Sequence, residues 1–140
     1  MSYLIREVDG SDNIDILAEL HETCFRDEAE QADYDVGFWW LAYFEKEPIG
    51  FAGLTPSQLG FNCGYLKRSG VLVEHQGHGL QKRLIRVREA KAKKLGWKRL
   101  VTDTTDNPAS SNSLYRAGFK LFAPAYPWAF DNTLYWTKTL

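Results

Sequence analysis

The sequence predicts a mixed α/β (α+β) fold in one domain of 140 residues, and two observations lead to this prediction. Runs rich in β-branched and aromatic residues, typical of strands, alternate with amphipathic runs typical of helices. In addition, a Gly-x-Gly turn at residues 77–79 joins an apolar strand to a long basic helix. The expected order of elements is β-α-(α)-β-β-β-α-β-α-β-β.

Caps and periodicity define the expected start of the chain. A strand over 2–8 precedes a helix that Asp12 or Asn13 caps and that runs to about Phe25. His21, on this helix, is expected at the surface. An apolar stripe marks the helix face that packs inward: Ile14, Leu17, Leu20 and Cys24.

Further along the chain, a basic amphipathic helix is expected from Leu80, and Gly96 ends it at the C′ position. Pro108 lies in the first turn of a short helix. Gly64 and Gly70 are expected to kink a long strand. Strands are expected over 38–44, 49–54, 62–73, 100–104, 119–122 and 133–137.

Composition and charge limit the classes of function. The chain is 44% hydrophobic and 25% charged, as globular proteins are, and its net charge of −1 argues against nucleic-acid binding. Residues 1–47 hold 13 of the 18 acids, whereas residues 82–99 hold nine of the 17 bases. This asymmetry indicates either an anionic ligand at one end and a cationic one at the other, or two solvated faces.

Cysteine use and hydropathy suggest a cytoplasmic protein without a membrane partner. Cys24 and Cys63 are far apart and form no Cys-x-x-Cys, so reduced thiols are expected. No apolar run approaches the roughly 18 residues of a membrane span, and no leader is recognised at the N-terminus. A homodimer is a possible assembly.

The stretch Val71–Gln81 predicts an anion site. A strand ends there, two glycines follow, and a helix begins. Glycines let backbone N–H groups turn toward one point, and the helix adds the positive end of its dipole. A phosphate or pyrophosphate is the natural ligand of such a turn.

This stretch resembles the phosphate loop of the GNAT N-acetyltransferase superfamily. That loop reads Gln/Arg-x-x-Gly-x-Gly/Ala and follows a strand that reads Val-x-Pro. Val71, Gln76 and Gly79 match the pattern, while Val73 replaces the Pro. Gln81 replaces the final small residue, so its side chain either alters the approach of the pyrophosphate or contacts it. The resemblance is firmest over residues 65–122.

A second motif of the family lies near the C-terminus. Asn107 and Ser110 stand eleven and eight residues before Gly118, as in the family. At the family's Tyr position, however, the chain has Leu114, and Tyr115 comes one residue later. One residue rotates a helical side chain by about 100°, so Tyr115 is displaced from the usual direction.

The resemblance implies a mixed central sheet with splayed strands and flanking helices. It also implies transfer of an acetyl group from acetyl-CoA to an amine of a small acceptor, by direct attack. An acyl-CoA-binding sensor with weak or no catalysis is the alternative. The implied coenzyme contacts are Val71, Leu72, Val73, Gln76, Gly77, His78, Gly79, Leu80, Gln81, Asn107 and Ser110.

Two tyrosines are the candidates for proton transfer. Tyr115 follows the family's Tyr position, and Tyr65 stands where some members carry a Glu; Tyr65 could equally be a core aromatic. Asp103 is expected in a turn or cap, and Glu74 in solvent. His78, and less so His75, could contact phosphate. No metal site is expected, because no further ligands accompany the two histidines.

The acceptor site is expected to involve a rigid loop and an acidic segment. Tyr126 and Trp128, in a loop that Pro124 and Pro127 make rigid, could form one wall. Negative charge would attract a cationic or amine-bearing acceptor, although the same charges could simply keep the segment soluble. The acids of this segment are Glu22, Asp27, Glu28, Glu30, Asp33 and Asp35.

Overall fold

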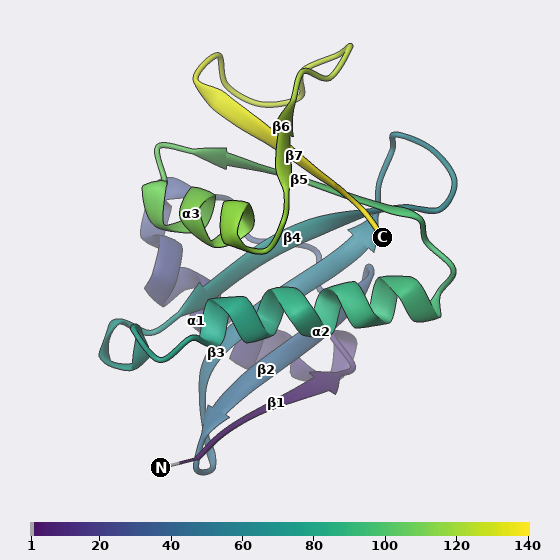
Figure 1. Ribbon diagram of the computed structural model, residues 1–140. Coiled ribbons are helices and arrows are strands. Elements are labelled where there is room, and N and C mark those ends of the chain that lie inside the picture. Colours follow the sequence, from purple (N-terminus) through teal and green to yellow (C-terminus); the bar gives the residue numbers. More distant parts are fainter. Residues whose placement is uncertain (1) are drawn as a thin grey trace. The chain divides into compact units, whose positions relative to one another are not determined.

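The computed structural model describes residues 2–140 and confirms the mixed α+β fold class (Figure 1). In this part of the chain, seven strands form a sheet in the order β1-β2-β3-β4-β5-β7-β6. The strands are β1 (Tyr3–Val8), β2 (Phe38–Phe44), β3 (Glu47–Pro56), β4 (Cys63–Val71), β5 (Arg99–Thr105), β6 (Lys120–Phe122) and β7 (Thr133–Thr139). The helices are α1 (Ile14–Phe25), α2 (Leu80–Lys94) and α3 (Pro108–Arg116), with 3-10 turns η1 (Ser11–Asn13), η2 (Arg26–Glu28) and η3 (Val73–His75).

Contacts divide the chain into two compact units. The first unit comprises Met1–Thr55 with Leu66–Arg88, and the second comprises Pro56–Tyr65 with Glu89–Leu140. The expected single domain and the splay of two strands therefore stay predictions. No helix among residues 2–140 has the length and hydropathy to cross a membrane.

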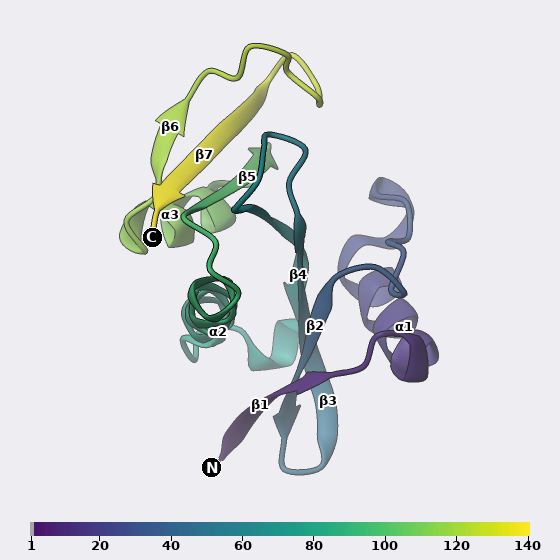
Figure 2. The same cartoon turned by 90° about the vertical axis from the view of Figure 1, so that its right-hand side faces the viewer.

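In the first unit, β1 pairs antiparallel with β2, and β2 with β3. β2 and β3 form a hairpin, with a register shift between Ala42 and Tyr43. Figure 2 shows α1 on one side of these strands and the start of α2 on the other. Apolar side chains from α1, β2, β3 and the loop before β2 form one buried cluster of the core: Leu17, Leu20, Tyr34, Trp39, Leu41 and Phe51.

The inward face of α1 differs from the predicted one. Leu17 and Leu20 are buried as expected, but Ile14 is exposed and His21 is 0% exposed. The surface placement of His21 is therefore wrong. Its ring packs 4.8 Å from the centroid of Phe25 and 6.0 Å from that of Phe51. His21 stands four residues after Leu17, on the apolar face of the helix, so helical periodicity places it inward and its polar character was the misleading signal.

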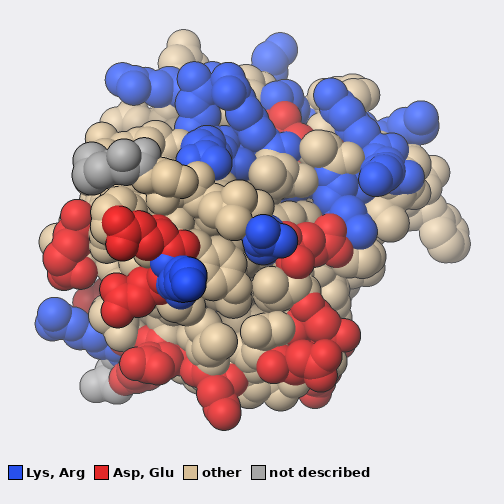
Figure 3. All heavy atoms as spheres, turned by 90° about the horizontal axis from the view of Figure 1, so that it is seen from below, with Lys and Arg blue, Asp and Glu red and all other residues tan. Residues whose placement is uncertain are grey.

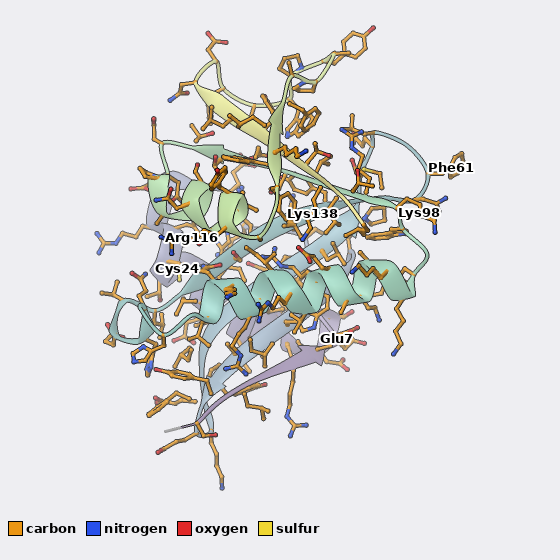
Figure 4. All side chains as sticks on the ribbon, viewed as in Figure 1. Glu7, Cys24, Phe61, Lys98, Arg116 and Lys138 are labelled. Carbon is orange, nitrogen blue, oxygen red and sulfur yellow. The ribbon has the colours of Figure 1, made fainter. Side chains whose placement is uncertain are left out.

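In the second unit, the first residues of β4 and β5 pair in parallel, and β7 lies antiparallel between β5 and β6. Lys138 on β7 (Figure 4) donates to the Glu89 carboxylate at 2.9 Å and to the Ala117 carbonyl at 2.6 Å. This ammonium ties α2 at Glu89 and the end of α3 to the sheet. The core of the unit is apolar: Leu100, Val101, Leu114, Phe119, Tyr135 and Trp136.

Two glycines of β4 allow neighbouring side chains to pack closely against the strand. The sequence analysis expected these glycines to kink the strand instead. A Cβ on Gly64 would lie 2.4 Å from the Trp97 ring, and one on Gly70 would lie 2.8 Å from Cys24 Sγ. Both cysteines, Cys24 and Cys63, are free. The strand ends at Val71, earlier than predicted, because the chain turns into η3.

Arg88, on α2, is a buried charge that hydropathy does not reveal. It is 2% exposed in the first unit. Its Nη1 donates to the carbonyls of Gly53 and Lys67, both at 3.2 Å, and its Nε donates to the Leu84 carbonyl at 3.0 Å. Charged donors to buried carbonyls are strong hydrogen bonds, so this guanidinium fastens α2 to β3 and β4.

We expect Arg88→Met to lower the free energy of unfolding by about 2–4 kcal/mol, because buried strand carbonyls lose their donor. Urea denaturation followed by tryptophan fluorescence measures this change. Arg86→Met, at an exposed position on the same helix, is the control and should stay within about 0.5 kcal/mol of the parent. Equal stability of the two variants would contradict the role assigned to Arg88.

Candidate functional site

The turn between β4 and α2 depends on two glycines in the first unit. Gly77 and Gly79 have φ of +82° and +75°, a region that side chains with Cβ rarely adopt. Apart from its own chain neighbours, no described residue has an atom within 4 Å of a Cβ built on either glycine. Among the described residues, none accepts a hydrogen bond from the N–H groups of 77–79. The turn thus offers open space lined by free backbone donors at a helix N-terminus.

Side chains brace this turn from β4. Gln76 Nε2 donates to the Val71 carbonyl at 3.1 Å, and Ser69 Oγ donates to Gln81 Oε1 at 3.0 Å. The Leu72 N–H donates to the Ile49 carbonyl at 2.9 Å. Gln81, which replaces a small residue of the family loop, is therefore engaged with the strand. Of the other predicted coenzyme contacts, Val71 and Leu80 are buried, whereas Val73 is exposed.

An aromatic and histidine cluster lies beside the turn. Tyr3 Oη and His75 Nδ1 are 2.9 Å apart, and the Tyr3 ring lies 5.3 Å from that of His78 and 5.2 Å from that of Phe44. Arg83 on α2 donates to the Tyr3 carbonyl at 3.3 Å. The face drawn in Figure 3 carries groups of acidic (red) and of basic (blue) side chains, with single basic side chains among the acids. The cluster brings an exposed cation and two imidazoles near a candidate phosphate site.

In the second unit, Asn107 caps α3. Its Oδ1 accepts a hydrogen bond from the Ser110 N–H at 3.1 Å, so the two predicted coenzyme residues bond to each other. Leu114 is buried, and Tyr115 is 73% exposed. The one-residue offset noted in the sequence therefore turns Tyr115 to the surface, and its catalytic role stays a prediction.

Tyr65, by contrast, belongs to a polar cluster on the second unit's strands. Its hydroxyl donates to Asp103 Oδ2 at 2.5 Å, and the indole N–H of Trp128 donates to the same oxygen at 2.9 Å. Trp128 stacks edge-on against Tyr135, 4.6 Å between centroids. Asp103 lies on β5, where it pairs with Tyr135, rather than in the expected turn. A carboxylate that accepts two hydrogen bonds from fixed aromatic groups can accept a proton through the Tyr65 phenol.

The residues predicted to contact the acceptor differ in exposure and in hydrogen bonding. Tyr126 is 88% exposed, whereas Trp128 is held by Asp103. Among the acids of 22–35, Asp35 lines a hollow of about 480 Å³ in the first unit, together with Glu7 and Asp9. The side chain of Asp27 lies outside the described part of the chain.

The sequence did not identify Asp103 as the hydrogen-bond partner of Tyr65. Asp103 follows an apolar run and so reads as a strand-end or turn residue. The contact arises because β4 and β5 pair in parallel, with Tyr65 opposite Val101, two residues before Asp103. An acidic residue within a β-branched strand was the one available signal, since Asp is depleted in strands. Among the described residues, no group of three metal-ligating side chains is present.

A family model and several solved structures resemble this chain. The family model described as Acetyltransferase (GNAT) family matches residues 6–119. No curated protein sequence matched the chain. An IAA acetyltransferase from Bacillus cereus ATCC 14579 is 18% identical, with 99% of this chain and 100% of that chain covered and a TM-score of 0.78.

Two further solved structures share the fold. A protein from Bacillus anthracis, provisionally named a streptothricin acetyltransferase and solved with acetyl coenzyme A, is 19% identical over 100% of this chain and 99% of that chain, with a TM-score of 0.76. Ribosomal-protein-S5-alanine acetyltransferase from Vibrio fischeri is 17% identical over 99% and 93%, with a TM-score of 0.73. Because the family model covers most of the residues and these structures have the same fold, the chain belongs to the GNAT acetyltransferase family.

Proposed function

We propose that this protein is an N-acetyltransferase that moves the acetyl group of acetyl-CoA to the amine of a small acceptor. The observation that carries the proposal is the glycine turn at 77–79, whose backbone N–H groups have no acceptor among the described residues. Family membership supports acetyl transfer in general. The family model also extends over both units, which supports the proposal that residues 1–140 act as one domain.

The glycine turn fits the pyrophosphate of coenzyme A. Free N–H groups of 77–79 and the first N–H groups of α2 would donate to its oxygens. Arg83 and His78 would add positive charge or donors nearby. Bound there, the coenzyme supplies a thioester carbonyl to be attacked by the acceptor.

Tyr65 and Asp103 are proposed as the proton path. The attacking amine must be neutral and must lose a proton as its nitrogen bonds to the acetyl carbon and the carbon–sulfur bond breaks. The amine proton passes to Tyr65 Oη while the phenol proton passes to Asp103. Asp103 then releases that proton to solvent, and the departing sulfur takes one up from solvent. An amide and a free thiol are the products, and the Tyr65–Asp103 pair is restored. The Tyr65–Asp103 hydrogen bond favours this enzyme over a sensor that only binds acyl-CoA.

Cytoplasmic location and a homodimer remain predictions from the sequence. Cell fractionation tests the first, and size-exclusion chromatography with light scattering tests the second.

Release of free thiol from acetyl-CoA, measured with a thiol reagent across a panel of amines, tests whether the protein is an enzyme or a sensor. Binding of acetyl-CoA without thiol release from any amine would favour the sensor.

Gly79→Val should weaken coenzyme A binding at least about tenfold, because a β-branched side chain fills the open turn and resists positive φ. Isothermal titration calorimetry with coenzyme A measures the affinity. Gly96→Val is a matched control, since Gly96 also has positive φ, of +82°, and an open Cβ position. Each variant should lose about 1–3 kcal/mol of stability from backbone strain. Similar coenzyme affinity in both would show that the turn holds no ligand.

Tyr65→Phe and Asp103→Asn should each lower kcat by about 10²–10⁴ on the best amine of the panel, with coenzyme affinity nearly unchanged. Tyr65→Phe keeps the ring that packs against Trp128, so folding should be retained. Tyr115→Phe is the control and should keep the parental rate, because Tyr115 is exposed. A large loss in Tyr115→Phe alone would instead assign proton transfer to Tyr115.

A further inference from the structure

One oxygen of the Asp103 carboxylate, in the second unit, accepts two hydrogen bonds, while the other accepts none from the residues that the structure describes. The Tyr65 hydroxyl donates to Oδ2 at 2.5 Å, and the indole N–H of Trp128 donates to the same Oδ2 at 2.9 Å. The proton path proposed above uses the contact from Tyr65. The contact from Trp128 has no part in that path.

The two donors together fix the plane of the carboxylate. The χ2 torsion of Asp, which turns the carboxylate about its Cβ–Cγ bond, has broad and roughly twofold preferences. A single hydrogen bond from Tyr65 would leave the carboxylate free to swing about this bond. A second donor at the same oxygen removes that freedom, because both hydrogen bonds must keep good geometry at once. The indole N–H of Trp128 therefore decides which oxygen of Asp103 faces the phenol.

Trp128 can hold this carboxylate but cannot carry a proton for it. The indole Nε1–H is a donor without acceptor capacity, so it neither takes a proton from Asp103 nor passes one on. Of the two donors at Oδ2, the Tyr65 hydroxyl is the one that can transfer its proton. Trp128 is thus suited to act through Asp103 as a positioning residue.

Neighbours on the sheet hold the Trp128 ring in place. It lies edge-on against Tyr135 of β7, with 4.6 Å between the centroids, and 6.5 Å from the Tyr65 ring. The next residue of the loop is fastened as well, since the Ala129 N–H donates to the Tyr135 hydroxyl at 3.0 Å. Tyr135 is buried and pairs with Asp103 across β5 and β7. The strands thus place the indole beside the carboxylate.

The contact with Asp103 also fastens a loop whose other aromatic residues are exposed. This loop joins β6 to β7 (Figure 1), and Tyr126 and Phe130 within it are exposed. Trp128, by contrast, donates to a carboxylate, and such a charge-assisted bond is stronger than one between neutral groups. Fastening the loop and orienting Asp103 are different roles, and they predict different rates in variants of Trp128.

We propose, on the basis of the acetyltransferase function above, that Trp128 orients Asp103 for proton transfer from Tyr65. The phenol proton enters the carboxylate at Oδ2 as Tyr65 takes the proton of the attacking amine, and Trp128 keeps its own proton throughout. This role differs from a wall of the acceptor site, which the sequence suggests for Trp128. Tyr65, Asp103, Trp128 and Tyr135 all belong to the second unit.

Trp128→Phe tests the proposal because it removes the indole N–H and keeps an aromatic ring. On the best amine of the panel, kcat should fall about 10- to 100-fold through lost alignment, with KM for the amine within about twofold of the parent. Trp136→Phe is the matched control, since the Trp136 indole also donates to a side chain of β5, Thr104 Oγ1, at 3.0 Å. It should keep the parental rate, although the change at this buried ring lowers stability.

A double-mutant cycle separates the positioning role from a structural one. Asp103→Asn removes the carboxylate, so adding Trp128→Phe to that variant should lower kcat by less than about twofold further. If Trp128 served only to fasten the loop, the losses from the two substitutions would multiply instead.

The same contact can be followed without substrate. The chain has five tryptophans, so five indole N–H signals are expected in a proton–nitrogen NMR spectrum, and Trp128→Phe identifies one of them. Asp103→Asn should move this signal, and speed its exchange with water, more than it does for the other four. The reason is that a neutral amide is a weaker acceptor than a carboxylate.

Four outcomes would overturn the role assigned to Trp128. They are parental kcat in Trp128→Phe while Asp103→Asn is slow, a raised KM in place of a lowered kcat, multiplied losses in the double variant, and an unmoved indole signal in Asp103→Asn. Failure of the acetyltransferase proposal looks different. The parent would acetylate no amine, or Tyr65→Phe and Asp103→Asn would both keep the parental rate, whereas the indole signal would still test the contact between Trp128 and Asp103.

Discussion

The backbone of the glycine turn imposes a constraint on which the rest of the coenzyme site depends. Positive φ at Gly77 and Gly79 directs consecutive N–H groups into open space instead of back into the protein. Such groups need acceptors, and the turn can tolerate their absence only because it lies at the surface. Gln76 and Ser69 restrain the turn from β4, so its donors are fixed before any ligand arrives. Preorganised donors lose little freedom when they bind an anion.

Two cations that folding removes from water, one in each unit, are held in the same way. Arg88 is almost wholly buried, yet three carbonyl hydrogen bonds satisfy it, so it holds α2 against the strands of the first unit. In the second unit, Lys138 donates to the Glu89 carboxylate and to the Ala117 carbonyl. Hydrogen bonds from charged donors are strong, so each cation fastens helices to strands while it regains acceptors in place of water.

Local signals in the sequence were enough to predict most elements of the fold. The helix that starts at Leu80 and ends before Gly96, and the helix capped by Asn107, follow from apolar periodicity and cap residues. Packing of residues distant in sequence was not predictable in this way. Asp103 meets Tyr65 because β4 and β5 pair in parallel, and Phe51 reaches His21 from β3. The burial of His21 itself follows from its place four residues after Leu17 on the apolar face of α1. An Asp within a β-branched strand was the single local sign of the contact with Tyr65.

The saturation of Arg88 has a consequence for how this chain changes over generations. A buried guanidinium whose acceptors lie on both β3 and β4 cannot be replaced alone without leaving those carbonyls unpaired. Its loss should therefore be rare among descendants of this chain, and where it occurs it should accompany changes in the strands that it holds.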